Sequence, residues 1–401
     1  MISELGVDVV VLEKGRIGET WLSQRWDSFS LNTPNWMNGL PGSPYPGDDP
    51  DGFMTHTELV DYFNEYVKEF DIDVRTGVNV TRVAPSNGDG RFVIETDSES
   101  GREQLECSQV VVASGIANSP HVPSVAAEFP EKIVQISTGT YRSPEHLPEG
   151  AVLVVGGGQS GGQIVEDLLD AGREVYFSIS NVGRVRRRYR GRDFMEWMDI
   201  LGIWDLATSD ADAEMLTATN PLTSGVGPRG HTISFQQLAA DGAHLMGRLE
   251  EVEDGVVWTD DRVMGYVRFG DEFSKELKDN IDDYIAEAGV EAEAPADDSA
   301  DEPIADDEDI EFVTRLDLDA SGVGAVIWCT GFTADFSWIE LPVTDDRGMP
   351  VHDRGVSAVP GLYFIGFPWL SKRKSGVVYG IEEDAAHIAK TIASELAGST
   401  H

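Results

Sequence analysis

Cysteine, lysine and long apolar runs are all scarce in this sequence. Only Cys107 and Cys329 are cysteines among the 401 residues, and neither belongs to a CxxC pair. This excludes a disulfide framework and the paired thiols of a disulfide reductase. No stretch reaches the roughly 18 consecutive apolar residues of a membrane helix, and the opening Met-Ile-Ser-Glu-Leu-Gly lacks the features of a secretory signal. We therefore expect a cytoplasmic protein with no membrane partner.

Positive charge is also scarce. Lysine and arginine together number 30 against 71 aspartates and glutamates, which leaves a formal net charge of -41, and only eight of the basic residues are lysines. Such a surface repels nucleic acids and anionic membranes, so neither is expected as a partner. The composition resembles that of proteins from salt-loving microbes and predicts a solvated, halophilic surface. An acidic docking face for a basic partner is the alternative.

The first residues have the pattern of the later part of a βαβ unit. Residues 7–12 are apolar and β-branched apart from Asp8, which is typical of a strand buried on both faces of a parallel sheet, and Glu13 ends the run. Residues 2–5 have the pattern of the last turn of a helix, stopped by Gly6. We expect the first strand and first turn of this unit to be missing.

The rest of the chain alternates buried strands with amphipathic helices, which predicts an α/β fold. Residues 78–83 and 91–96 flank a turn-rich segment at 85–90 and predict an antiparallel hairpin. Residues 291–309 are nearly all Ala, Asp, Glu and Pro, and predict a flexible loop. The other expected elements are helices at 57–70, 163–169 and 380–396, and strands at 109–113, 150–155, 174–179, 325–328 and 361–365.

A glycine-rich turn lies between the strand at 150–155 and the helix at 163–169. It has the sequence Gly156-Gly-Gly-Gln-Ser-Gly161, in the context that the dinucleotide fingerprint requires. Gly156 permits the tight turn, Gly158 admits a diphosphate close to the backbone, and Gly161 allows close packing of helix on strand. Gln159 and Ser160 begin the helix, whose N-terminus attracts phosphate. A purely structural glycine turn is the alternative.

The strand that follows the glycine turn indicates which nucleotide is bound. It ends at Ser180-Asn181, where an NAD-selective site would carry an acidic residue. Six arginines occur between positions 184 and 192, and arginine suits the 2′-phosphate of NADPH. Ser180, Arg184 and Arg187 are the candidate ligands. Pairing of these arginines with the protein's own carboxylates is the alternative.

Glu13 stands where a second dinucleotide fold would hold an adenosine ribose. It is followed by a segment containing Gly18, Thr20, Trp21 and Arg25, and with these residues the sequence resembles the class B flavin-dependent monooxygenases. Three later segments match the same family. They are Val111-Val-Ala-Ser-Gly115 with Ala113 and Gly115, Val326-Ile-Trp-Cys-Thr-Gly331 with Gly331, and Gly361-Leu-Tyr-Phe-Ile-Gly366 with Gly366.

The resemblance implies an enzyme with FAD and NADPH as cofactors. NADPH would reduce FAD, and a peroxyflavin formed with molecular oxygen would oxygenate a small substrate at nitrogen or sulfur. The implied fold has two doubly wound Rossmann-like domains, with an FAD domain at 1–148 plus 316–401 and an inserted NADPH domain at 149–315. Asn32 and Trp369 are expected to line the flavin face. The resemblance is also compatible with a homodimer.

The sequence departs from the family in two places. The family's first GxGxxG, which binds the FAD diphosphate, would lie upstream of Glu13 and is absent from this sequence. The family signature FxGxxxHxxxF/Y survives only in part between Phe129 and Tyr141, with Glu131 at its glycine and Ser137 at its histidine. The alternatives are therefore an FAD-dependent NADPH oxidase or reductase, and a nucleotide-binding regulatory flavoprotein associated with potassium transport.

No metal site is expected. The histidines at positions 121, 231 and 387 have no metal-ligand spacing with one another or with the cysteines.

Overall fold

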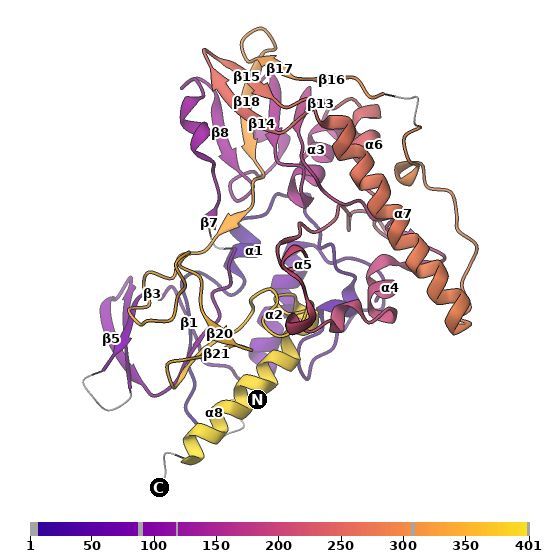
Figure 1. Ribbon diagram of the computed structural model, residues 1–401. Coiled ribbons are helices and arrows are strands. Elements are labelled where there is room, and N and C mark those ends of the chain that lie inside the picture. Colours follow the sequence, from indigo (N-terminus) through magenta and orange to yellow (C-terminus); the bar gives the residue numbers. More distant parts are fainter. Residues whose placement is uncertain (1–6, 87–90, 118, 306–308, 399–401) are drawn as a thin grey trace.

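A computed structural model describes residues 7–86, 91–117, 119–305 and 309–398. The helix turn expected at residues 2–5 lies outside these residues, as do positions 87–90 of the hairpin turn and positions 306–308 of the acidic segment. The fold has two groups of elements (Figure 1). One is built on a parallel sheet with α3 and α7, and the other holds α2 and the C-terminal helix α8.

The larger sheet is six-stranded, in the order β16-β13-β10-β9-β18-β8, and all its pairings are parallel. Its central strand β9 is buried at every position because it consists of five apolar residues that are covered on both faces. Val152 and Val154 pack with Ile164 of α3, whereas Leu153 packs with Trp328 on the opposite face. The bounds are β16 Phe312–Val313, β13 His244–Met246, β10 Val175–Ser178, β9 Ala151–Val155, β18 Val323–Trp328, β8 Val134–Ser137, α3 Gln159–Asp170, α6 Phe235–Ala240 and α7 Val263–Ala288.

This sheet takes strands from both sides of the segment 149–315. β8 precedes that segment and β18 follows it, yet β18 pairs with both β9 and β8. The apolar run of β18 is buried at five of its six positions, which explains why it lies inside the sheet. The strand at 325–328 was correctly predicted, but the sheet extends beyond the expected domain boundaries.

The second group of elements contains two small parallel pairings. β1 (Val11–Glu13) pairs with β2 (Val74–Thr76), and β6 (Val110–Val112) pairs with β22 (Leu362–Phe364). The antiparallel hairpin is confirmed as β3 (Asn79–Pro85) and β4 (Phe92–Ser98), with a third strand, β5 (Gly101–Cys107), that was not predicted. The helices are α1 Glu19–Ser23, α2 His56–Glu69 and α8 Ile381–Gly398, and β20 His352–Asp353 and β21 Val356–Ser357 extend the sheet of β22.

The expected helices at 57–70 and 380–396 are confirmed as α2 and α8. The side chain of Thr55 caps the backbone N–H of Glu58, and the Glu58 side chain accepts from the Thr55 N–H, so α2 begins with a capping box. Ile388 and Ile392 of α8 are fully buried against Tyr363 of β22.

The strand expected at residues 7–12 is shorter and more exposed than the sequence suggests. Only Val11–Glu13 forms β1, and the side chains of Val9, Val10 and Val11 are 37–41% exposed. Within the described residues β1 pairs on one edge only, with β2, which leaves part of its apolar surface uncovered. The expectation of burial on both faces was wrong for this strand.

The acidic segment 291–309 is not a free loop where the structure describes it. It returns alongside α7 (Figure 1) and contains the short helix Ser299–Asp301. The Asp301 side chain is buried, and its carboxylate accepts hydrogen bonds from Ser274 and from Lys278 of α7. Composition alone missed this docking because the matching cations lie in distant segments. The remaining elements include η2 Asn35–Asn38, β7 Ser119–Pro120, α4 Phe194–Ile200, α5 Ala213–Thr217, β14 Leu249–Glu253, β15 Val256–Thr259, β17 Arg315–Asp317 and β19 Phe332–Thr333.

Among the described helices, none combines the length and the apolar character needed to cross a bilayer.

Candidate functional site

The glycine turn joins β9 to α3 as the sequence predicted. Gly156 has a φ of +118°, which a residue with a side chain rarely adopts. A Cβ at Gly161 would lie 1.9 Å from the carbonyl oxygen of Gly156, so this glycine allows the helix to approach the strand. Gly158 caps the helix without a side-chain hydrogen bond. The first turn of α3 therefore offers backbone N–H groups and a partial positive charge to an anion.

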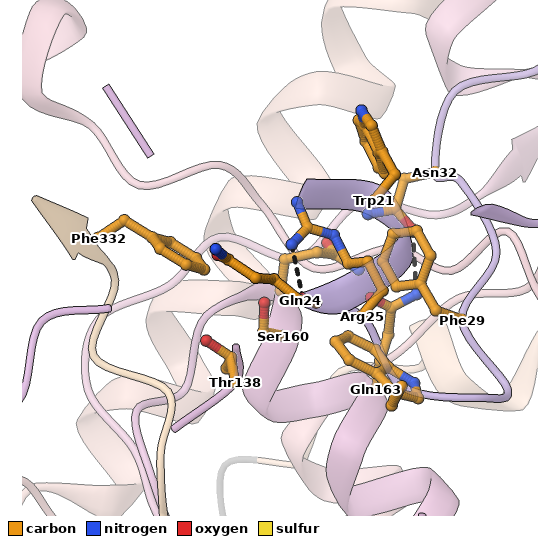
Figure 2. Close-up of a pocket in the computed structure, with 11 residues that line it drawn as sticks. Trp21, Gln24, Arg25, Phe29, Asn32, Thr138, Ser160, Gln163 and Phe332 are labelled. Atoms are coloured by element: carbon orange, nitrogen blue, oxygen red, sulfur yellow. Dashed lines mark hydrogen bonds between the residues drawn. The ribbon is translucent and has the colours of Figure 1, made fainter. Parts of the chain in front are cut away.

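A cavity of about 120 Å³ lies where α3 faces the segment that begins at α1. Figure 2 shows side chains from both parts converging on it, with Trp21 and Arg25 on one side and Ser160 and Gln163 of α3 on the other. The cavity thus joins two motifs that are more than a hundred residues apart in the sequence. Its lining residues are Trp21, Gln24, Arg25, Trp26, Phe29, Asn32, Thr138, Gln159, Ser160, Gln163 and Phe332.

Among the residues that the structure describes, Arg25 is the only charged side chain in this lining. Its guanidinium lies 4.8 Å from the ring centre of Trp21 and 5.5 Å from that of Phe29, and it donates to the carbonyl oxygen of Gln24 at 2.8 Å. It forms no ion pair with a carboxylate of the described residues, and burial lowers its pKa. The cavity therefore carries a positive charge that the protein itself does not neutralise.

Two buried oxygen atoms in the lining lack hydrogen-bond partners among the described residues. They are Oγ1 of Thr138 and Oε1 of Gln24. Thr138 is 3% exposed and is fixed by its backbone N–H, which donates to the carbonyl oxygen of Trp328 at 3.2 Å. Asn32 differs from them, because its Oδ1 accepts from Nε2 of Gln163 at 3.1 Å. Buried polar atoms are normally paired, so the two orphans point to a polar ligand in this cavity.

A loop at residues 219–231 covers the glycine turn. Gln159 accepts the Thr223 backbone N–H at 3.0 Å and donates to the Thr223 carbonyl oxygen. A Cβ at Gly158 would have Cγ2 of Thr219 as its nearest neighbour, 3.9 Å away. This leaves room beside the turn, as a bound diphosphate would need.

The arginines expected to bind the 2′-phosphate are paired within the protein. Arg184 is 3% exposed and its guanidinium contacts the carboxylates of Asp271 and Asp301, the latter at 3.2 Å. Arg187 is 1% exposed, and its Nε donates to Asp193 at 2.8 Å. This geometry favours the alternative that these arginines neutralise the protein's own acids. Arg186, Arg190 and Arg192 also pair internally, with Asp298, Asp282 and Glu196. Ser180 is half-buried at the end of β10.

Most of the residues expected to bind FAD follow the small parallel strands β1, β6 and β22, whereas Gly331 follows β18 of the larger sheet. Glu13 Oε1 accepts the backbone N–H of Gly15 at 2.8 Å. Gly18, at φ +70°, begins α1, which contains Thr20 and Trp21. Ala113 is exposed beyond β6. Gly115, Gly331 and Gly366 share a positive φ and have no atom within 4 Å of the position a Cβ would take, so this region leaves space for a ligand.

Trp369 does not line the cavity that contains Asn32. It has a φ of +55°, and its carbonyl oxygen accepts from Oγ1 of Thr208 at 2.8 Å. The structure therefore brings together Trp21, Arg25, Asn32, Gln159 and Ser160, but separates Trp369 from them.

The sequence did not identify several lining residues as candidates. Thr138 directly follows Ser137 in the eroded signature, and Gln163 lies one helical turn after Gln159, so both positions carried a weak signal. Gln24 and Phe29 lie within the segment that resembles the flavin-dependent monooxygenases. Phe332 follows Gly331 directly, but only the fold shows that it reaches this cavity. Trp26 lines the same cavity.

Neither cysteine has the properties of a reactive thiolate. Both are free, and burial raises the pKa of Cys329 and of Cys107. Over the described part of the chain, no group of three or more metal-ligating side chains comes together. His231 Nε2 instead contacts Glu166 Oε1 at 2.6 Å.

Comparisons with known proteins agree with this geometry. Residues 1–191 match the family model described as pyridine nucleotide-disulphide oxidoreductase. An uncharacterized CzcO-like oxidoreductase of Geobacillus kaustophilus is 29% identical over 385 residues, which cover 96% of this chain and 90% of that protein. An uncharacterized oxidoreductase CzcO of Bacillus subtilis is 28% identical over 396 residues, covering 96% and 92%. The chain is similar to these oxidoreductases over nearly its whole length.

The fold of this chain is that of a flavin monooxygenase. The flavin-containing monooxygenase from Stenotrophomonas maltophilia aligns with a TM-score of 0.61 over 97% of this chain and 99% of its own, at 17% identity. The predicted α/β fold with dinucleotide-binding domains is confirmed, as is the resemblance to flavin-dependent monooxygenases. Enzymes of that type use FAD and NADPH.

Proposed function

We propose that this chain is an FAD- and NADPH-dependent monooxygenase that acts on a small molecule with a nucleophilic nitrogen or sulfur. The observation that carries the proposal is the cavity that joins the two nucleotide motifs. It is lined by Trp21 and Arg25 of the flavin-type segment and by Gln159 and Ser160 of the glycine turn. A nicotinamide and a flavin must meet for hydride transfer, and this is where the two motifs converge.

The chemistry of the lining supports a reaction carried by cofactors. Among its described residues there is no aspartate, glutamate, histidine or cysteine, so they offer no ordinary general acid, general base or thiol nucleophile. Bound FAD would accept hydride from NADPH and pass the electrons to molecular oxygen. The protein would orient the two nucleotides and exclude water, with Trp26 and Phe29 as the apolar wall.

The open glycine region supports the FAD site. Gly366 and Gly115 combine a positive φ with free space, and Glu13 lies at the end of β1, where an adenosine ribose would be held.

The finer assignments rest on composition and resemblance. We infer a cytoplasmic protein, because Cys107 and Cys329 offer no disulfide framework. We also infer a salt-adapted surface, because acidic residues outnumber basic ones 71 to 30. The same charge argues against nucleic acid and anionic membranes as partners. A homodimer fits the resemblance.

The proposal is tested by measuring how much NADPH is consumed for each molecule of oxygenated product formed. The protein is reconstituted with FAD and supplied with NADPH, oxygen and a panel of thioethers and tertiary amines. A monooxygenase couples each NADPH consumed to one oxygenated product and one water. Substrate-independent release of peroxide would instead establish the NADPH oxidase.

One observation favours the oxidase as a second candidate. The segment that should carry the family signature is occupied by structural contacts. Oγ1 of Thr140 accepts the Ser137 backbone N–H at 3.0 Å, and the buried Tyr141 hydroxyl donates to Asp167 at 2.5 Å. NADPH binding without any turnover would support the regulatory flavoprotein.

A further inference from the structure

The cavity combines a cation, a helix N-terminus and two unpaired oxygen atoms in one small space. Arg25 lies across from the first turn of α3, where Ser160 and Gln159 begin the helix (Figure 2). Both the guanidinium and the helix end are positive. Placing them on one cavity without a carboxylate between them is unfavourable, and a bound anion would relieve it.

Arg25 has no carboxylate partner among the described residues, and its guanidinium donates only to the carbonyl oxygen of Gln24. Carboxylates outnumber basic residues 71 to 30, and the neighbouring basic cluster is paired throughout, from Arg184 with Asp301 to Arg192 with Glu196. Because Arg25 is half-buried and has no carboxylate partner among the described residues, its guanidinium can still pair with an anionic ligand. Arg25 is held in place by the carbonyl oxygen of Gln24 and by the ring of Trp21.

The two buried oxygens without hydrogen-bond partners indicate which groups the ligand must carry away from Arg25. Gln24 Oε1 is a buried acceptor and Thr138 Oγ1 is a buried hydroxyl that can donate or accept, and neither has a hydrogen-bond partner among the described residues. A phosphate oxygen can accept from the Thr138 hydroxyl but cannot donate to Gln24 Oε1, whereas a sugar hydroxyl can. The ligand must therefore carry phosphate oxygens and hydroxyl groups close together, as a ribose phosphate does.

We propose that Arg25 binds the diphosphate of NADPH from the side opposite the glycine turn, and that Thr138 and Gln24 accept hydrogen bonds from the nicotinamide ribose. This rests on the proposed function and deepens it, because it assigns a residue of the flavin-type segment to the other nucleotide. The dinucleotide is then clamped between two segments that are distant in sequence. Arg25 is a positioning residue for the nicotinamide.

Two ligands distinguish specific binding of the diphosphate and nicotinamide ribose from an effect of the substitution on nucleotide binding as a whole. NADP⁺ carries the diphosphate and the nicotinamide ribose, whereas adenosine 2′-monophosphate lacks both and keeps the adenosine end. Calorimetry with each ligand on the full chain gives two dissociation constants per variant. Arg25→Gln is expected to weaken NADP⁺ binding about 10- to 100-fold, the range for one hydrogen bond to a charged group. Its affinity for adenosine 2′-monophosphate should stay that of the wild type.

A second variant tests the ribose contact independently. Thr138→Val removes Oγ1 at nearly constant volume and should weaken NADP⁺ binding about 3- to 10-fold, again without affecting the adenosine ligand. Arg102→Gln, an arginine that is 89% exposed on β5, is the control and should change neither constant.

Three other outcomes would overturn either the inference or the proposed function. Wild-type affinity of Arg25→Gln for NADP⁺ overturns the inference while leaving the proposed function intact. Equal loss of both ligands by Arg25→Gln or by Thr138→Val also overturns it, since the effect is then not selective for the nicotinamide end. Failure of the wild type to bind either ligand defeats the proposed NADPH function itself.

Discussion

Arg184 and Asp301 form a buried ion pair across 117 residues of sequence, with Arg184 Nε 3.2 Å from Asp301 Oδ1. Both residues are 3% exposed. Asp301 also contacts Lys278, with Nζ at 2.6 Å, and Arg184 also contacts Asp271. This network attaches the acidic segment to α7 and occupies an arginine that the sequence had assigned to the 2′-phosphate of NADPH.

Replacing Asp301 by Asn should therefore destabilise the protein without improving nucleotide binding. Removing one partner of a buried ion pair leaves uncompensated charge, and we expect a loss of about 3 kcal/mol in the free energy of unfolding, measured in urea. Asp279→Asn, at an exposed pair with Lys275, is the control and should cost less than about 0.5 kcal/mol. A tighter NADP⁺ complex in Asp301→Asn would show that Arg184 is a phosphate ligand after all.

Gln159→Ala tests the loop that covers the glycine turn. The variant loses both hydrogen bonds to the Thr223 backbone, so the loop at 219–231 is held less firmly beside the nucleotide. Two neutral hydrogen bonds predict a loss of about tenfold in NADP⁺ affinity, measured by calorimetry. Gln237→Ala, whose side chain donates to Asp241 on the surface, should leave affinity unchanged. Equal affinities for both variants would remove this loop from the site.

Gly161→Ala tests the close packing of α3 on β9. The new Cβ would lie 1.9 Å from the carbonyl oxygen of Gly156, so the helix must shift, at a cost of about 3 kcal/mol in unfolding free energy. Gly265→Ala in α7 has no atom within 4 Å of its Cβ and should be neutral or slightly stabilising. A Gly161 variant as stable as the Gly265 variant would mean that the turn is looser than described.

The pair of His231 and Glu166 predicts a pH dependence of stability. The hydrogen bond that His231 donates to the carboxylate of Glu166 is the main cause that raises the pKa of His231 above its usual 6.5. A raised folded-state pKa stabilises the protein fully below about pH 6.5 and loses that contribution as the pH rises through the folded value. His231→Gln should thus cost more unfolding free energy at about pH 6 than at about pH 9.

The size of this effect stays below about 1 kcal/mol, because the His231 side chain is 42% exposed. The measurement is a urea titration of both proteins at the two pH values, with His121→Gln as the control. A cost that is equal at both pH values, or larger at high pH, would contradict the assignment.

The parts of the fold that could be predicted are those with strong local signals. The run of β9, its glycine turn and the helix α3 were expected because apolar periodicity and glycine spacing are read from adjacent residues. The hairpin of β3 and β4 followed from its turn chemistry. Helix α1 was missed, since its five residues are too few to show a period.

The parts that could not be predicted depend on partners far along the chain. Asp301 is buried because Arg184 and Lys278 surround it, which no composition rule detects. β18 joins the larger sheet although the sequence placed it beyond the inserted domain. The same holds for the site, where Thr138 and Gln24 meet α3 only in the folded chain. The spacing of residues in the sequence identified the motifs, but only the structure shows which motifs face one another.

The central claim is that this chain brings FAD and NADPH together for hydride transfer. Anaerobic titration of the FAD-loaded protein with NADPH, followed in the visible spectrum, tests it most directly. The account predicts that the absorption of oxidised flavin is bleached by one equivalent of NADPH and returns on admission of oxygen. A protein that does not hold FAD, or that holds FAD which NADPH leaves oxidised, would contradict it.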